Sequence, residues 1–476
     1  MREWLRICDD PQRHECHPTL RGQLPTRVLE VFSVHDPEVL RLHVSAPNET
    51  GRYLALSHRW GVPSENRRFC TLRSNYDQFR DHVSFDQLPK TFQDAITVTR
   101  SLEIPFLWID SLCIIQDDLE DWEAQSKLME DVFNFSYCTI AATCAQGTTD
   151  GFLKPRALRD FVTLKHKSGD VFYVCKTIDN FGVDVEEGEL SQRGWVLQER
   201  ALSHRTIHFT ETQVYWECGD GIHCETLNKM RNLKSAILGD SEFPKSAERL
   251  VKGGRIELFQ FLYRRYSRLA FTNKTDRSIA ISGLEERLFR TFNTRGAYGV
   301  FDAFLNRSLL WQRNGAEMRR ISYPRWRNAP SWSWMAYDGW ITYVDIPFGG
   351  VDWFDSLESP FRQNPVSNTG NANDGGETSP IELAAIARDF SRALPRRPME
   401  FVVFDRPDTE HHPEFKCVVI GQDMPLDVSA VQKYYILVVT PASSGGATRT
   451  YERVGAGFVG KHELDLEGPK YEIRIR

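Results

Sequence analysis

The distribution of apolar and polar positions predicts short buried strands alternating with helices in the first part of the chain. Apolar runs of strand length occupy residues 53–57, 106–109 and 138–142, and the first two are followed at once by polar residues. Between them, apolar residues recur at helical spacing over residues 92–102 and 122–133. This order predicts an α/β unit with a mainly parallel sheet, since continuous apolar strands are typical of sheets buried on both faces.

Polar residues mark where the two helices should begin. Thr91 follows Pro89 and precedes Asp94 by three residues, so we expect Thr91 to cap the first helix. Acidic residues crowd positions 117–123, ahead of the second helix. Such a run favours a helix N-terminus through the helix dipole, and a divalent-ion site stays open as the alternative.

The rest of the chain changes character twice. Residues 194–202 have a helical pattern, residues 205–209 and 212–216 resemble strands, and residues from about 240 to 315 are helical in pattern. From Pro330 onward the pattern is β-rich. A chain of 476 residues is too long for one hydrophobic core. We expect an N-terminal extension (1–50, strands and turns), an α/β domain (51–235), a helical region (236–320) and a β-rich region (321–476) with a flexible loop at 364–380.

Composition excludes several classes of protein. The formal net charge of -6 argues against a nucleic-acid binder, which normally carries a basic surface. No apolar run approaches the roughly 18 residues of a membrane span, and residues 1–10 meet charge too early for a signal peptide. The ten cysteines show no disulfide-framework spacing. We therefore expect a cytoplasmic protein with reduced thiols.

Other candidate chemistry is weaker. No Gly-rich phosphate loop is present, and Cys113 and Cys144 lack a partnered histidine, so we expect neither a dinucleotide loop nor a thiol nucleophile. Two clusters contain metal-ligand residue types but not the paired spacing of a structural zinc site, so no metal is expected. They are Cys8, His14, Cys16 and His17, and then Cys218, His223 and Cys224.

Three sequence blocks carry a resemblance to a known family. They are residues 53–61 (YLALSHRWG), residues 88–133 with LPKTFQDAI and LWIDSLCIIQDD, and residues 193–203 (RGWVLQERALS). In this order they closely resemble the fungal heterokaryon-incompatibility (HET) domain. Residues 275–284 and 330–334 are similar to segments that follow this domain in many such proteins. The resemblance implies a cell-death factor of fungal non-self recognition.

The HET domain is in turn remotely similar to TIR domains, which have a flavodoxin-like fold and some of which cleave the N-glycosidic bond of NAD. Residues 56–59 resemble the first TIR strand and its basic loop, and residues 107–110 resemble the second strand with its terminal Asp. Residues 195–199 resemble the Trp-x-x-x-Glu element with the catalytic glutamate. Trp60, where a second basic residue can occur, and the long insertion between Ala142 and Arg193 depart from the pattern.

The resemblance implies a site at one end of the strands. Glu199 is expected to be catalytic, with NAD as substrate and no cofactor. One fixed carboxylate can stabilise the oxocarbenium-like charge that builds when nicotinamide leaves, and Arg59 suits the pyrophosphate. Ligands of open parallel sheets bind outside the carboxyl ends of the strands. The expected NAD contacts are Ser57, His58, Arg59, Trp60, Asp110 and Trp195.

Structural interpretations of the same residues stay open. Trp195 could be core, Asp110 could cap a turn, and His58 could be satisfied by the backbone. Glu199 could form an ion pair with one of three arginines, Arg193, Arg200 or Arg205. The function predicted is NAD depletion by an effector that assembles with itself or with an incompatibility partner. The alternatives are a non-enzymatic oligomerising signalling module and an unrelated α/β enzyme that shares only the fold.

Overall fold

The computed structural model divides the chain into two compact units, residues 1–246 and 247–476. The predicted flexible loop at 364–380 lies outside the residues that the structure describes. The described residues are 1–10, 12, 22–33, 35–61, 69–156, 159–230, 245–315, 318–324, 328–361, 381–391, 401–406, 414–424, 432–442 and 450–476.

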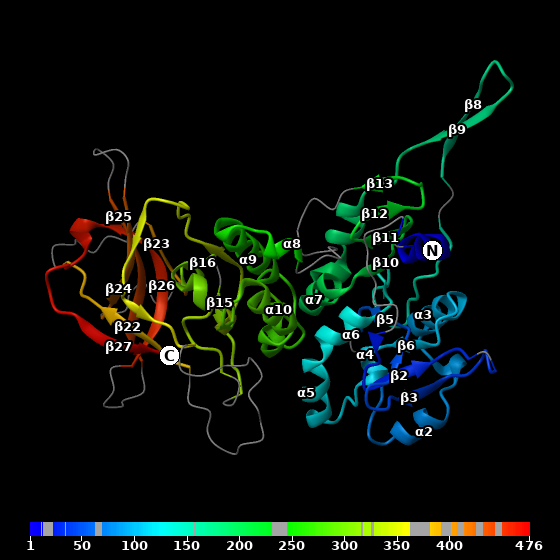
Figure 1. Ribbon diagram of the computed structural model, residues 1–476, viewed down its shortest axis with the longest axis horizontal. Coiled ribbons are helices and arrows are strands. Elements are labelled where there is room, and N and C mark those ends of the chain that lie inside the picture. Colours follow the sequence, from blue (N-terminus) through cyan, green and yellow to red (C-terminus); the bar gives the residue numbers. More distant parts are fainter. Residues whose placement is uncertain are drawn as a thin grey trace. The chain divides into compact units, whose positions relative to one another are not determined.

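A nine-stranded sheet forms the centre of the N-terminal unit (Figure 1). Its strand order is β13-β12-β11-β10-β7-β5-β6-β2-β3. The strands, in that order, are Lys229–Met230, Gly221–Cys224, Val214–Cys218, Arg205–Phe209, Cys138–Ala141, Tyr53–Ser57, Phe106–Trp108, Arg27–Glu30 and Arg41–Val44. Two further two-stranded sheets are β1 (Gly22–Gln23) with β4 (Thr50–Gly51) and β8 (Phe161–Lys165) with β9 (Val171–Cys175).

The four middle strands of this sheet are parallel. Leu54 of β5 pairs in parallel with Leu107 of β6 on one side and with Cys138 of β7 on the other, and β7 pairs in parallel with β10. The three apolar runs predicted as strands of a parallel sheet are therefore confirmed, and they are neighbours. The outer strands are antiparallel to their neighbours, so the whole sheet is mixed rather than mainly parallel. Short connections such as the one from β10 to β11 permit only antiparallel pairing, which the apolar pattern alone did not indicate.

The first fifty residues contain more than the expected strands and turns. Helix α1 (Arg2–Asp9) buries Leu5 and Cys8, and Asp9 accepts hydrogen bonds from Arg205 (2.9 Å) and Tyr137 (2.6 Å). The helix escaped prediction because two buried apolar positions are too few to establish a helical period. Strands β2 and β3 from the same segment extend the central sheet beside β6.

Helices cover both faces of the parallel strands. The strand order reverses at β5, which makes the end of this strand a topological switch point. The chain passes from β5 through α3 (Lys90–Ser101) to β6, then back across β5 through α5 (Leu119–Lys127) and α6 (Met129–Phe135) to β7. Right-handed crossovers in opposite directions put α3 on one face and α6 on the other. Helix α7 (Gly194–Leu202), which leads to β10, packs on α6, and Figure 1 shows both on the opposite side of β5 from α3.

The loop after β7 is held by the first turn of α3. This helix begins at Lys90 after Pro89, so the prediction of Thr91 as its cap is wrong. The Thr91 hydroxyl instead donates to the Gly147 carbonyl (2.9 Å), and Asp94 accepts from the backbone amide of Phe152 (2.8 Å). The acidic run behaves as the helix interpretation expected, because Asp118 caps α5 by accepting from two backbone amides. Thr91, Asp94 and Asp118 therefore all have structural hydrogen-bond partners.

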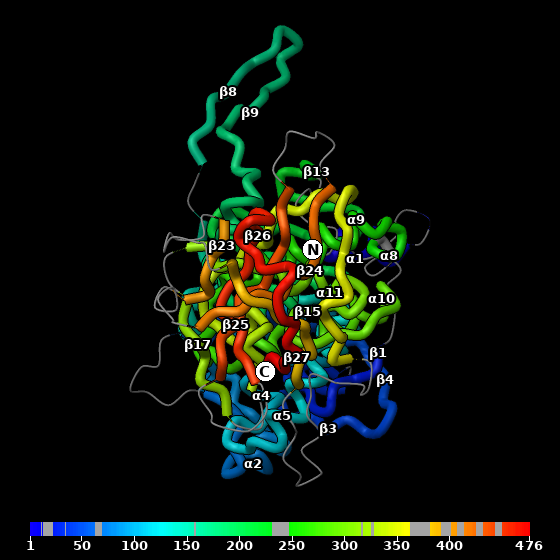
Figure 2. The backbone as a smooth tube through the Cα atoms, turned by 90° about the vertical axis from the view of Figure 1, so that its left-hand side faces the viewer, coloured from blue at the N-terminus to red at the C-terminus, as the bar shows by residue number. Residues whose placement is uncertain are grey.

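The C-terminal unit is helical and then β-rich, as its pattern predicted (Figure 2). Its eight-stranded sheet runs β20-β24-β25-β26-β27-β22-β21, with β23 on β26. Trp332 and Trp334 are fully buried. None of the described helices is both long and apolar enough to cross a bilayer. The helices are α8 (Lys245–Glu248), α9 (Lys252–Tyr266), α10 (Ser282–Phe292) and α11 (Leu305–Leu309). The strands, in sheet order with β23 last, are Val351–Trp353, Lys416–Asp423, Lys433–Pro441, Thr450–Gly460, Tyr471–Ile475, Leu383–Ala387, Leu357–Glu358 and Val402–Phe404.

Candidate functional site

The candidate site surrounds the carboxyl end of β5. The connection that follows β5 crosses one face of the sheet, whereas the connections that follow its parallel neighbours β6 and β7 cross the other face. Ligands of open α/β sheets bind where the connections change face in this way. Ser57 ends β5, and His58, Arg59 and Trp60 follow it. Asp110 begins helix α4 (Asp110–Cys113) just after β6, so it lies at the same edge of the sheet. The predicted strand-end residues therefore come together at one edge.

Glu199 reaches this edge from helix α7. Its side chain is buried, with 8% of the residue exposed, and the Ser57 hydroxyl donates a hydrogen bond to its Oε2. Ser203, one turn later, donates to the Glu199 carbonyl (2.7 Å) and exchanges a hydrogen bond with Thr139 of β7 (2.7 Å). The helix is thereby fixed against β7, and the carboxyl group of Glu199 is fixed against the end of β5.

Burial raises the pKa of Glu199 to about 7. The Ser57 hydrogen bond and the positive charge of Arg193 both lower this pKa, and the negative charge of Asp110 raises it, but desolvation is the largest effect. The group is thus poised between its neutral and charged forms near neutral pH. Perturbed carboxyls of this kind concentrate at functional sites, although structural networks also produce them.

Glu199 does not take part in the structural ion pairs that were open alternatives. Arg200 pairs with Glu217 (2.6 Å), which also accepts from His208 (2.9 Å), and this trio lies in the interior. Arg205 pairs with Asp9. These two arginines are neutralised elsewhere, so only the third candidate, Arg193, acts on Glu199, and it does so through its charge.

His58 is buried beneath the site. Its Nδ1 lies 3.9 Å from Asp110 Oδ1, and its Nε2 is buried without a hydrogen-bond partner among the described residues. Burial lowers its pKa, which Asp110 partly opposes, so the ring is neutral at pH 7. Arg193 donates to the His58 carbonyl oxygen and ties the segment before α7 to the β5 loop.

Asp110 and Trp60 hold each other at the rim. The Trp60 indole N–H donates to Asp110 Oδ2 (2.8 Å), and Oδ1 of the same carboxylate accepts from the Ser111 amide (2.6 Å). Asp110, the first residue of α4, therefore accepts an amide hydrogen bond within that helix and also positions an aromatic ring from the loop after β5.

Arg59 and Trp195 complete the group. Arg59 is partly exposed, pairs with Glu189 and donates to Gln146 Oε1 (2.5 Å). Trp195 is half-buried one turn before Glu199 on α7, so both side chains share one side of the helix. A cationic side chain and an aromatic side chain thus lie on elements that meet at the edge that holds Glu199.

Four further residues belong to this edge; three of them were missed, and Arg193 was considered only as an ion-pair partner of Glu199. Gln146 and Glu189 hold Arg59, Arg193 binds the His58 carbonyl, and Ser111 has a buried hydroxyl without a partner among the described residues. The signal that could have found Gln146 is its place just after β7, a parallel strand whose end also lies at this edge. For Arg193 the corresponding signal is its place directly before the predicted helix Gly194–Leu202.

Other candidate chemistry finds less support. Burial raises the pKa of the Cys113 thiol to about 12, which makes it a poor nucleophile. In the described parts of the chain, no three His, Cys, Asp or Glu side chains converge as a metal site would require. Most of the first Cys and His cluster, residues 14–17, lies outside the described residues.

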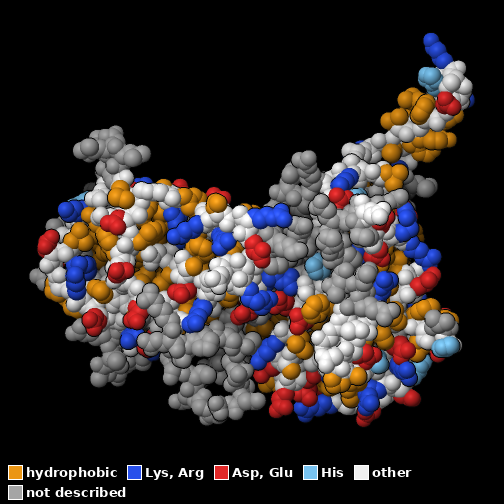
Figure 3. Space-filling view, in the orientation of Figure 1, with side chains coloured by type: hydrophobic (Ala, Val, Ile, Leu, Met, Phe, Trp, Pro, Cys, Tyr) orange, Lys and Arg blue, Asp and Glu red, His pale blue; other side chains and the backbone are white. Residues whose placement is uncertain are grey.

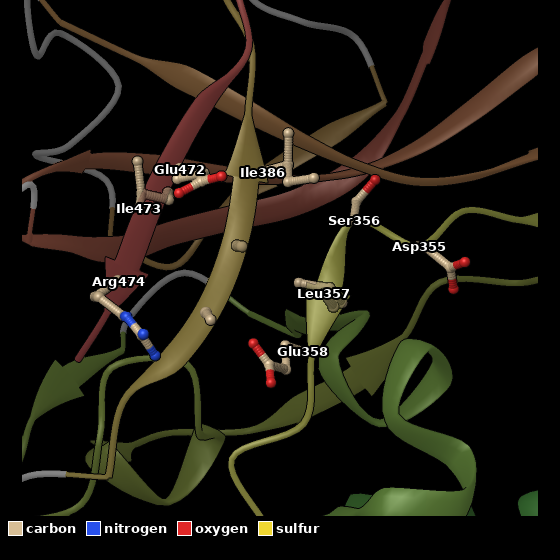
Figure 4. Close-up of a pocket in the computed structure, with 10 residues that line it drawn as sticks. Asp355, Ser356, Leu357, Glu358, Ile386, Glu472, Ile473 and Arg474 are labelled. Atoms are coloured by element: carbon tan, nitrogen blue, oxygen red, sulfur yellow. The ribbon is translucent and has the colours of Figure 1, made fainter.

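The C-terminal unit has a hollow of its own, over β21, β22 and β27 (Figure 4). Its charged side chains, Asp355, Glu358, Glu472 and Arg474, are exposed to solvent. Because water screens them, the hollow lacks the desolvated charge that distinguishes the β5 edge. It is lined by Asp355, Ser356, Leu357, Glu358, Ala384, Ala385, Ile386, Glu472, Ile473 and Arg474.

The fold and site define an α/β domain with a buried carboxyl group at the switch point of its parallel strands. Residues 53–199 match the family model described as Heterokaryon incompatibility protein (HET). The chain therefore carries a HET domain, and the match begins with β5 and ends on Glu199. No curated protein and no solved structure matches the chain.

Proposed function

We propose that this protein hydrolyses the nicotinamide N-glycosidic bond of NAD, with Glu199 as the catalytic carboxylate. The HET domain implies a role in heterokaryon incompatibility, and NAD depletion would be the means of cell death in that role. The observation that carries the proposal is a desolvated carboxyl at the β5 switch point, free of any arginine ion pair among the described residues.

The strand order supports the comparison with flavodoxin-like and TIR domains. Counting the parallel strands along the chain as β5, β6, β7 and β10, their order in the sheet is 2-1-3-4. Flavodoxin-like sheets share this order and bind their ligand where the first strand meets the third. In this protein that position is the end of β5 beside β7, where Ser57 and Glu199 meet.

The chemistry needs one anion. When the bond between ribose C1′ and the pyridinium nitrogen breaks, its electron pair passes to nicotinamide, which leaves neutral and needs no acid. Positive charge then builds on the ribose as an oxocarbenium-like species. An ionised Glu199 stabilises this charge in a water-poor site. Water then adds at C1′ and loses a proton, which gives ADP-ribose.

The neighbouring residues suit the rest of the substrate. The Arg59 guanidinium fits the pyrophosphate, and it would exchange the carboxylate of Glu189 for phosphate oxygens. Trp195 offers a ring for stacking next to the catalytic group. A cationic nicotinamide ring beside Glu199 would favour the charged carboxylate, so that substrate binding itself ionises the catalytic group.

A non-enzymatic signalling module is the second candidate. The observation that favours it is the burial of both Ser57 and Glu199, whose hydrogen bond joins β5 to α7 as a structural contact would. Incubating the purified full chain with NAD and following nicotinamide by chromatography separates the two. Release above a heat-inactivated control supports hydrolysis, whereas intact NAD at high protein concentration favours the module.

A further inference from the structure

The hairpin β8–β9 exposes apolar side chains along its whole length. All ten residues of its two strands are exposed, seven of them large and apolar. In the described part of the chain these strands pair only with each other. Figures 1 and 2 show the hairpin projecting from the N-terminal unit, and Figure 3 shows hydrophobic side chains along it. A lone two-stranded hairpin has little stability in water, which indicates that a partner completes it.

The two edges of the hairpin differ. Strand β8 ends in Lys165, and the turn that follows is polar, with His166, Lys167 and Asp170. Strand β9, VFYVC, has neither a charge nor a proline to keep another strand from pairing with it. The polar turn argues against insertion of the tip into lipid. The unguarded β9 edge favours addition of another strand.

The backbone of β9 offers a self-complementary set of hydrogen-bonding groups. His166 donates its amide to the Asp170 carbonyl (2.8 Å), so the 166–170 pair is a hydrogen-bonded one. Hydrogen-bonded and non-bonded pairs alternate along an antiparallel ladder, and Thr163 and Tyr173 form a non-bonded pair. The amide and carbonyl groups of Val171, Tyr173 and Cys175 therefore point away from β8. These three residues are spaced evenly about Tyr173, as a two-fold axis requires.

We propose that β9 is an assembly edge through which two copies of this chain pair in antiparallel fashion, centred on Tyr173. Val171 of each copy then lies opposite Cys175 of the other, and each Phe172 lies opposite a Val174. The two polar turns point in opposite directions, so Lys167 of one copy does not meet that of the other. A second copy is the occupant that fits, since the edge is complementary to itself under this rotation.

A charge placed at the centre of the edge tests the proposal. Sedimentation velocity of the full chain should show a dimer whose fraction increases with protein concentration. Tyr173→Lys should abolish this dimer because two lysines would face each other across the interface. Thr163→Lys is the matched control, since Thr163 is opposite Tyr173 but on the β8 side. Its dimer should persist. A wild-type chain that stays monomeric, or equal dimerisation by both variants, overturns the proposal.

Disulfide trapping tests the register. In a Cys175→Ser background, Tyr173→Cys should crosslink on mild oxidation, because Cα atoms of a hydrogen-bonded antiparallel pair lie about 5.5 Å apart, within disulfide range. Phe172→Cys should not, since its counterpart in the other copy lies diagonally across the ladder. Crosslinking through position 172 but not 173 would indicate packing of the opposite hairpin faces and refute edge pairing.

Discussion

Replacing Glu199 with Gln should change the stability of the protein in a pH-dependent way. The pKa of Glu199 is about 7 in the folded protein against an ordinary value of 4.5. Between these values the folded state binds more protons than the unfolded state, so the free energy of unfolding falls as pH rises through this window. A difference of about 2.5 pKa units corresponds to about 3 kcal/mol. Gln keeps an oxygen that accepts from Ser57 but has no charge to desolvate, so the variant escapes this loss.

Thermal melts of both proteins from pH 5 to pH 8.5 measure the effect. The melting temperature of Glu199→Gln minus that of the wild type should rise with pH, by roughly 6–12 °C for a domain of this size. Glu187→Gln, a change at an exposed carboxylate of the same unit, should give a difference that stays flat. A flat difference for Glu199→Gln as well would show that its carboxyl is not desolvated, and the argument for its role would fail.

Three further changes separate chemistry from structure. Ser57→Ala removes a hydrogen bond that lowers the pKa of Glu199. In the wild type kcat/KM should rise with pH near pH 7, and in this variant the rise should move to higher pH. An unmoved pH profile would contradict the pairing of Ser57 with Glu199. Arg59→Ala should raise KM for NAD more than it lowers kcat, with Arg59→Lys intermediate, whereas equal kinetics in steady-state assays would remove Arg59 from the pyrophosphate site. Glu217→Gln breaks a buried ion pair and should cost about 3–5 kcal/mol by denaturant unfolding; a loss near zero would show that this pair is not structural.

Local sequence patterns predicted the elements around the site well. Helix α7 begins and ends at the predicted residues, and the three apolar runs are neighbouring parallel strands because each is long and apolar enough to be buried on both faces. Parallel neighbours place their ends at one edge, which is why Ser57 and Asp110 could be assigned to a common region from the sequence.

Pairwise contacts over long separations could not be predicted. The partners of Arg59, Gln146 and Glu189, lie 87 and 130 positions away, and nothing in their local sequence marks them. Thr91 had the local pattern of a helix cap, but its hydroxyl binds the loop after β7 instead. The hairpin of β8 and β9 was not predicted, and its apolar residues alone do not show whether such a hairpin is buried or projects.

Nicotinamide release by wild type and Glu199→Gln, at equal concentrations of folded protein, tests the central claim most directly. The substitution keeps size and the hydrogen bond from Ser57, so the fold should persist while one preorganised charge is lost. Removal of such a group typically lowers the rate on the order of 10²–10³-fold. We predict a loss of that size at pH 8, where the wild-type carboxyl is ionised. Equal rates of nicotinamide release from the two proteins would contradict the assignment of Glu199 as the catalytic carboxylate.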